Sequence, residues 1–81
     1  MNYAVIFTYS FDNDCAVYLF ATEEEAKKFL IDTFQQEVKE DLDLDWDIEA
    51  EISEDGWYAK IINHFTNRDD ITEMRIGNIY Q

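Results

Sequence analysis

Residues 41–65 read DLDLDWDIEAEISEDGWYAKIINHF, and they contain the strongest structural pattern in this chain of 81 residues. From residue 41 to residue 52, acidic and apolar side chains alternate without a break, which is the period of a strand with one buried face. Asp55-Gly56 follows, a dipeptide typical of a two-residue type I′ hairpin turn. Residues 57–65 form a second apolar-rich run. The stretch therefore predicts a β-hairpin with a half-buried first strand.

The turn sets a register that the chemistry of both hairpin faces can test. The inner face carries the pairs Glu54–Trp57, Ile52–Ala59, Ala50–Ile61, Ile48–Asn63 and Trp46–Phe65. The outer face carries the pairs Glu51–Lys60, Glu49–Ile62 and Asp47–His64. Two of these outer pairs join opposite charges, the second once His64 is protonated. The agreement supports the register, because a slip by one residue would reverse every side chain.

A helix and another hairpin precede this stretch. Thr22 and Glu25 have the spacing of a capping box, and apolar residues recur every three or four positions after them. They predict a helix from about Glu23 to about Asp41. The remaining predicted elements are strands at 3–10 and 15–21 around a polar turn at 12–14, a loop at 66–70 and a last strand at 71–80.

Together these elements predict a single α+β domain over residues 1–81, in the order β-β-α-β-β-β. One helix packs on a mostly antiparallel sheet in two layers, which leaves the other sheet face to solvent or to a partner. In the last strand, Met74 and Ile76 are predicted to lie inside. In the first hairpin, we expect Val5, Phe7, Val17 and Leu19 to face the helix, and Ile6, Tyr18 and Phe20 to face away.

The charge balance narrows the range of partners. The chain has 19 acidic and 6 basic residues, a net charge of −13, and residues 23–55 alone hold 14 acids and three lysines. We therefore expect no direct binding to nucleic acid and none to anionic membranes, since both need cations on the protein. The chain has no apolar run near the roughly 20 residues of a membrane span. With no signal-peptide pattern and a single cysteine, Cys15, we expect a cytoplasmic protein.

Few residues are suited to catalysis or to holding a cofactor. Cys15 and His64 lie in or beside predicted strands, without the glycines of a nucleophile elbow, and one residue of each type is a poor zinc set. Two glycines cannot build a phosphate loop. The acids of residues 43–54 have the spacing of a calcium loop, but Ile48 stands where that loop needs glycine. We expect no catalytic residue, no metal and no cofactor.

Two surfaces remain as candidate partner-binding sites. The first is the row of acids on the predicted strand, made of Asp43, Asp45, Asp47, Glu49 and Glu51. Its spacing of about 6.6–6.8 Å is roughly twice the 3.4 Å between phosphates along a DNA strand, although a solvated strand face explains the same pattern. The second surface is the outer sheet face around Tyr58 and Ile62, where exposed apolar side chains would mark an interface.

The segments TYSFDNDCAVYLFATEEEAKKFL (residues 8–30) and SEDGWYAKIINHF (residues 53–65) resemble a group of small acidic proteins. Members of this group are carried on conjugative transposons and phages of Gram-positive bacteria. The resemblance covers most of the chain and implies a mobile-element origin and a cytoplasmic location. It transfers no catalytic or ligand-binding residue to any position.

The sequence thus favours a non-enzymatic, acidic protein-interaction module. We expect a protein partner, with a basic or nucleic-acid-binding protein fitting the charge and a homodimer as a second arrangement. The alternative function is a nucleic-acid-mimicking inhibitor, of antirestriction or anti-CRISPR type, of a DNA-binding defence protein. The acid row would be the working surface of the mimic, and the sheet face that of the interaction module.

The concentration of charge predicts a fold that is more stable in salt. Like charges within residues 23–55, whose net charge is −11, repel each other in the folded chain. Salt screens this repulsion over about 8–10 Å at physiological ionic strength. Thermal melts at low and moderate sodium chloride should give a midpoint that rises with salt. A falling midpoint would mean that specific ion pairs outweigh the repulsion.

Overall fold

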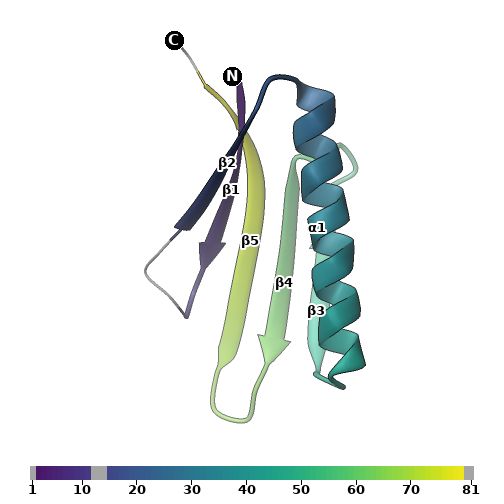
Figure 1. Cartoon of the computed structure of the whole chain (residues 1–81). Coiled ribbons are helices and arrows are strands. Elements are labelled where there is room, and N and C mark those ends of the chain that lie inside the picture. The colour runs from purple at the N-terminus through teal and green to yellow at the C-terminus, as the bar shows by residue number, and fades with distance from the viewer. Residues whose placement is uncertain (1, 12–14, 80–81) are drawn as a thin grey trace.

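One helix packs against an antiparallel sheet of five strands in the computed structural model of the chain, which describes residues 2–11 and 15–79 (Figure 1). The elements in chain order are β1 (Tyr3–Tyr9), β2 (Cys15–Phe20), α1 (Glu23–Asp43), β3 (Ile48–Ile52), β4 (Tyr58–His64) and β5 (Asp69–Asn78). The predicted two-layer α+β fold and its β-β-α-β-β-β order are confirmed. The predicted turn at 12–14 lies outside the described residues.

The sheet has the strand order β2-β1-β5-β4-β3, so the last strand lies at its centre. β5 pairs antiparallel with β1 on one side and with β4 on the other. It begins earlier than predicted, because Asp69 and Asp70 pair with the end of β4 instead of forming a loop. The remaining connection is short, and it is closed by a 2.9 Å hydrogen bond from the Phe65 amide to the Arg68 carbonyl.

The core lies between α1 and the middle of the sheet. Its buried side chains come from the three strands β1, β4 and β5 and from the helix: Val5, Phe7, Ala26, Leu30, Ala59, Ile61, Met74 and Ile76. Met74 and Ile76 are therefore inside, as predicted. Thr22 caps the helix by accepting a 3.2 Å hydrogen bond from the Glu25 amide, and the Thr22 hydroxyl donates to the Glu25 carboxylate. The predicted cap is confirmed, although Glu25 bonds the hydroxyl and not the cap amide.

The register of the second hairpin is confirmed, but its turn is of another type. β3 and β4 pair as predicted from Ile48–Asn63 to Ile52–Ala59. A type I′ turn would need positive φ at both Asp55 and Gly56, yet only Gly56 has it, at 74°. The Gly56 amide donates to the Ser53 carbonyl over 3.1 Å, so Glu54 and Asp55 are the central residues of the turn.

In the first hairpin, the predicted facing of β2 is wrong. Val5 lies opposite Tyr18 and Phe7 opposite Ala16, and opposite residues share a sheet face. Tyr18 and Phe20 therefore face the helix, where their rings lie 4.9 and 5.1 Å from that of Phe29. Val17 and Leu19 point away from the helix and are 54% and 52% exposed. Ile6 lies opposite Val17 and also points away, as predicted.

The strand predicted from residue 41 is also shorter than expected. The helix continues to Asp43, Asp45 turns the chain with φ of 60°, and β3 begins only at Ile48. Hydrogen bonds from the Asp45 and Trp46 amides to the Leu42 and Asp41 carbonyls close the helix end. Asp is a poor strand former, and its side chain tolerates the left-handed region better than most.

The two glycines are predicted to respond differently to the same substitution. Gly56→Ala should lower the free energy of unfolding by about 1–2 kcal/mol, because it places a Cβ at positive φ, 3.4 Å from Ile31 Cδ1. Gly77→Ala should be neutral or stabilising, since its Cβ would meet only Ile6 Cδ1, at 4.0 Å. Denaturant melts of both variants measure this. Equal losses would mean that the φ of Gly56 carries no energetic weight.

Candidate functional site

The predicted row of five carboxylates is not a single strand in the folded chain. Asp43 is the last residue of the helix, Asp45 lies in the left-handed turn, and Asp47 precedes β3. Only Glu49 and Glu51 are strand residues on the outer sheet face. The regular spacing expected of a phosphate mimic is therefore kept only between the carboxylates of Glu49 and Glu51.

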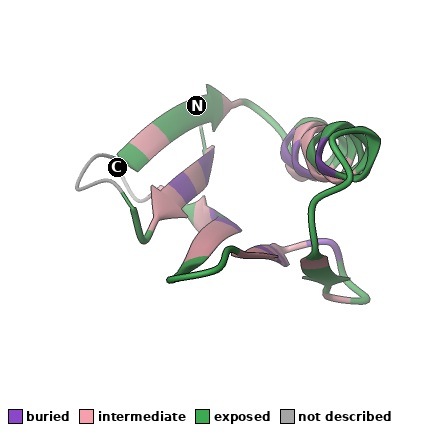
Figure 2. Ribbon diagram, turned by 90° about the horizontal axis from the view of Figure 1, so that it is seen from below, coloured by how far each residue is buried: buried purple, intermediate pink, exposed green. Residues whose placement is uncertain are grey.

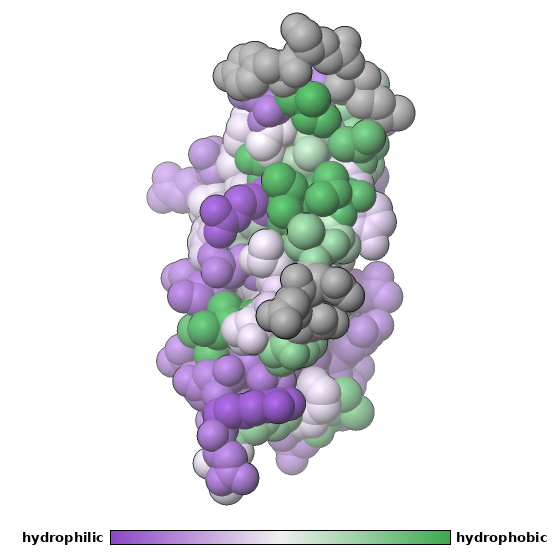
Figure 3. Space-filling view, turned by 90° about the vertical axis from the view of Figure 1, so that its left-hand side faces the viewer, coloured by the Kyte–Doolittle hydropathy of each residue, from purple (hydrophilic) through white to green (hydrophobic). Residues whose placement is uncertain are grey.

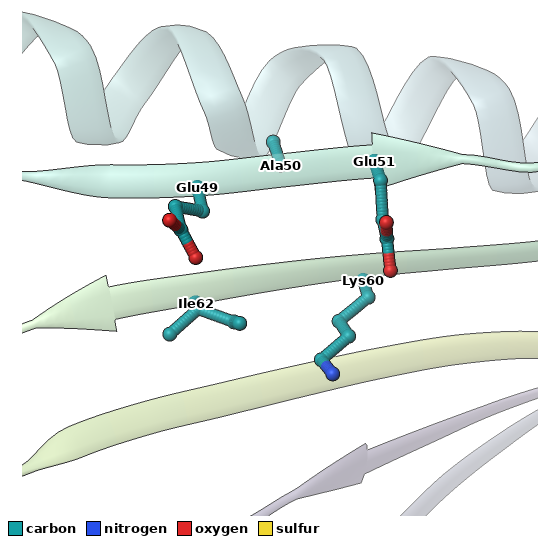
Figure 4. Close-up of a pocket in the computed structure, with 5 residues that line it drawn as sticks. All are labelled: Glu49, Ala50, Glu51, Lys60 and Ile62. Atoms are coloured by element: carbon teal, nitrogen blue, oxygen red, sulfur yellow. The ribbon is translucent and has the colours of Figure 1, made fainter.

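The outer face of β3 and β4 forms a shallow hollow lined by Glu49, Ala50, Glu51, Lys60 and Ile62. In Figure 4, Glu49 and Glu51 project over β4 toward Ile62 and Lys60, while Ala50 points back toward the helix. Its volume of about 180 Å³ is below the roughly 300 Å³ of the smallest usual ligand pockets. This hollow suits a side chain of a partner better than a free small molecule.

Tyr58, the first residue of β4, lies on the outer face in a polar cluster with β5. Its hydroxyl donates a 2.8 Å hydrogen bond to Glu73 Oε2, which also accepts from Arg75 Nη2 over 3.0 Å. The Arg75 guanidinium lies over the Tyr58 ring, 5.8 Å from its centroid. Desolvation and the bond to Glu73 raise the pKa of the Tyr58 hydroxyl. The ring is thereby held between the charged side chains of Glu73 and Arg75.

Apolar side chains gather at the β2 end of the same sheet face. Val17 lies opposite Ile6, and Leu19 lies opposite Ala4, in the register of the first hairpin. Figure 3, which looks onto the β2 side of the molecule, shows hydrophobic surface concentrated toward one end. Figure 2 shows that the helix lies on one side of the sheet only. The outer face therefore combines an apolar end with a charged middle.

His64 lies at the opposite end of this face, between two carboxylates. Its Nδ1 is 2.8 Å from Asp69 Oδ1, and its Nε2 is 3.4 Å from Glu49 Oε2. The predicted neighbour Asp47 contacts it through the backbone, where the Asp47 carbonyl accepts from the His64 amide. Cys15 is on β2, with two strands between it and β4. The fold therefore does not bring Cys15 and His64 together.

A second candidate site was not predicted from the sequence. It is a cleft of about 430 Å³ on the helix side of the sheet, between the C-terminal half of α1 and the β4–β5 connection. Aromatic side chains form two pairs in its wall, Tyr9 with Phe11 and Trp46 with Phe65, each pair with ring centroids 5.4 Å apart. The sequence did predict that Trp46 and Phe65 lie opposite each other. The cleft itself depends on the strand order, which no local pattern specifies.

The charged groups of the cleft are mainly acidic: Glu37, Asp41 and Asp70 against Arg68. Asp41 is 9% exposed and accepts a 3.3 Å hydrogen bond from the Asn63 amide. Glu37, one helical turn earlier, has a pKa raised by desolvation and by the charges of Asp41 and Glu40. Asp70 is paired with Arg68, whose Nε lies 3.1 Å from Asp70 Oδ1. Two carboxylates of the cleft therefore have no cationic partner within residues 2–11 and 15–79.

No protein-family model, curated protein or solved structure matches the chain. The resemblance to small acidic mobile-element proteins therefore stays a prediction. Over the described ranges, the structure contains no group of three or more histidine, cysteine or acidic side chains placed to hold a metal ion. Within the same ranges, the helix is not apolar enough to cross a membrane.

The position of His64 predicts a pH-dependent stability. The hydrogen bond to Asp69, with its charge and that of Glu49, raises the pKa of His64 against an opposing desolvation effect. The stabilisation is complete below the unfolded-state pKa of about 6.5 and is lost as pH rises through the higher folded-state pKa. The melting temperature should therefore fall between pH 6 and pH 8.

His64→Gln should flatten this dependence, because His64 is the only histidine of the chain. The matched control is Asn63→Gln, which changes the neighbouring residue without removing a titrating group. Melts of the three proteins at both pH values, with an NMR titration of the imidazole, measure the effect. An unchanged slope in His64→Gln would assign the pH dependence to another group.

Proposed function

We propose that this chain is a non-enzymatic, acidic protein-interaction module of the cytoplasm that binds a basic protein through its outer sheet face. The observation that carries the proposal is the bare face of the sheet. The helix covers the opposite side, and the outer face presents the exposed apolar residues Val17 and Leu19 beside the charged cluster of Tyr58. An apolar patch rimmed by polar groups is typical of a protein interface.

The charge of the chain supports a basic partner. A net charge of −13 attracts a cationic surface over long distances and speeds its association. Face-to-face pairing of two copies would instead bring two such charges together. A homodimer is therefore the less favoured arrangement, and a basic protein is the proposed occupant.

The absence of catalysis is part of this proposal. His64 is held between Asp69 and Glu49, so its ring nitrogens are engaged by acids. The hydroxyl of Ser10, directly after β1, accepts a hydrogen bond from the Ile71 amide of β5. These contacts are those of structural side chains, and neither pairs a nucleophile with a base.

A nucleic-acid mimic is the second candidate, and the net charge favours it. The row of five carboxylates that gave it a phosphate-like spacing is interrupted at Asp43, Asp45 and Asp47. The mimic therefore rests on charge alone, whereas the interaction module rests on charge and on an apolar face. The origin from a mobile element, implied by the resemblance above, is compatible with both.

The test is binding to a partner captured from bacterial cytosol and then purified. Tyr58→Ala with Ile62→Ala should weaken binding strongly, because partly buried anchors dominate interface energies. Val17→Ser with Leu19→Ser, both more than half exposed, is a second face variant with little effect on folding. Leu42→Ser with Leu44→Ser is the matched control, since these leucines are 58% and 59% exposed but lie outside the sheet.

A third set of changes distinguishes the two candidate functions. Asp43, Asp45 and Asp47 are changed to Asn and Glu49 to Gln, which removes charge with little change in shape. The interaction module predicts retained binding with a slower association rate, since steering is reduced. Loss of binding in this variant, with full binding by both face variants, would overturn the proposal in favour of the mimic.

A further inference from the structure

We infer that the cleft between α1 and the β4–β5 connection binds the guanidinium group of an arginine side chain. The cleft places two aromatic pairs beside Glu37 and Asp41, two carboxylates without a cationic partner among the residues that the structure describes. It is distinct from the outer sheet face, because its lining residue Ile61 belongs to the core on the helix side of the sheet. The inference rests on the proposed function only in taking a basic protein as the source of the arginine.

The size of the cleft is suited to a side chain. Its volume of about 430 Å³ falls within the roughly 300–1,000 Å³ range of ligand sites in proteins. Three of its aromatic residues keep accessible surface: Phe11 is 53% exposed, Trp46 41% and Phe65 38%. Rings of this kind, exposed at a concave site, offer stacking surfaces to an incoming group.

The charge of the cleft selects a cation. Arg68 bonds Asp70 through both Nε and Nη2, at 3.1 and 3.4 Å, so this pair is internally neutralised. Asp41 is 9% exposed and accepts a 3.3 Å hydrogen bond from the neutral side-chain amide of Asn63. A buried carboxylate without an opposite charge is costly, and a cation entering the cleft relieves that cost. Glu37 lies one helical turn away and adds a second negative charge.

The combination of rings and carboxylates favours guanidinium over ammonium. Guanidinium is planar, stacks on aromatic faces and bonds carboxylates with two parallel donors. It is also more weakly hydrated than ammonium, so it enters a partly enclosed site at lower cost. The fold already contains one contact of this type, where Arg75 lies over Tyr58 while bonding Glu73.

The experiment is an NMR titration of the ¹⁵N-labelled chain with the peptide acetyl-Gly-Arg-Gly-amide. The two tryptophans act as internal reporters, since Trp46 lines the cleft and Trp57 bonds Glu23 at the start of the helix. The peptide should shift the indole signal of Trp46 and leave that of Trp57 in place. The same peptide with citrulline, the neutral isostere of arginine, should cause no shift.

Variants that remove single negative charges show which carboxylates contribute to binding of the arginine peptide. Glu37→Gln should weaken peptide binding about three- to fivefold, the effect of losing one partly exposed ion pair. Glu40→Gln is the matched control, because it removes one negative charge from the same part of the helix but does not line the cleft. Asp41→Asn should weaken binding further. If Asp41→Asn does not fold, Glu37→Gln against Glu40→Gln remains a complete test.

Three results would overturn the inference: equal shifts with arginine and citrulline, equal weakening in Glu37→Gln and Glu40→Gln, or tighter binding of the corresponding lysine peptide. The outer-face variant Val17→Ser with Leu19→Ser should bind the arginine peptide as the original chain does. Because that variant is expected to lose the protein partner, failure of the cleft and failure of the sheet-face proposal give different results.

Discussion

The pairing of β5 with both β1 and β4 joins two hairpins into one sheet, and every surface described above depends on it. Each hairpin has its own local connection, but β5 alone pairs with a strand of both hairpins. Met74 and Ile76 of β5 then lie in the middle of the core, between the two hairpins. The outer face becomes continuous from Leu19 on β2 to Glu49 on β3 through the same strand.

The mismatch in width between helix and sheet explains why two surfaces remain uncovered. Five strands span about 19 Å from edge to edge, whereas a helix with its side chains is about 10–12 Å across. One helix therefore covers the centre of one face. Among the described residues no helix covers the outer face, and the end of the inner face near Trp46 and Phe65 forms the aromatic cleft. Both surfaces are therefore supported by one small core between the helix and the sheet.

The sequence predicted those features of the fold that depend on interactions between residues close together in the chain. The register from Ile48 to Ile52 follows from the position of the turn and from alternation within one hairpin, so it was recovered even though the type of the turn was wrong. The helix end was predicted to within two residues, but the start of β3 was not recovered, because Leu42 and Leu44 fit both a helical and a strand period. Contacts far along the chain decide between them, such as that between Asp41 and Asn63. The sheet face on which Val17 lies depends on the pairing of β1 with β2. The cleft depends on the order of the strands in the sheet.

The central place of β5 also sets an order of events during synthesis. The first hairpin, the helix and the second hairpin all leave the ribosome before the strand that joins them. Until β5 has emerged, β1 and β4 each present an open edge and the face of each hairpin toward the core is uncovered. The dense negative charge of residues 23–55, made in this interval, would keep such nascent chains apart. Repulsion between these charges therefore acts before the fold is complete.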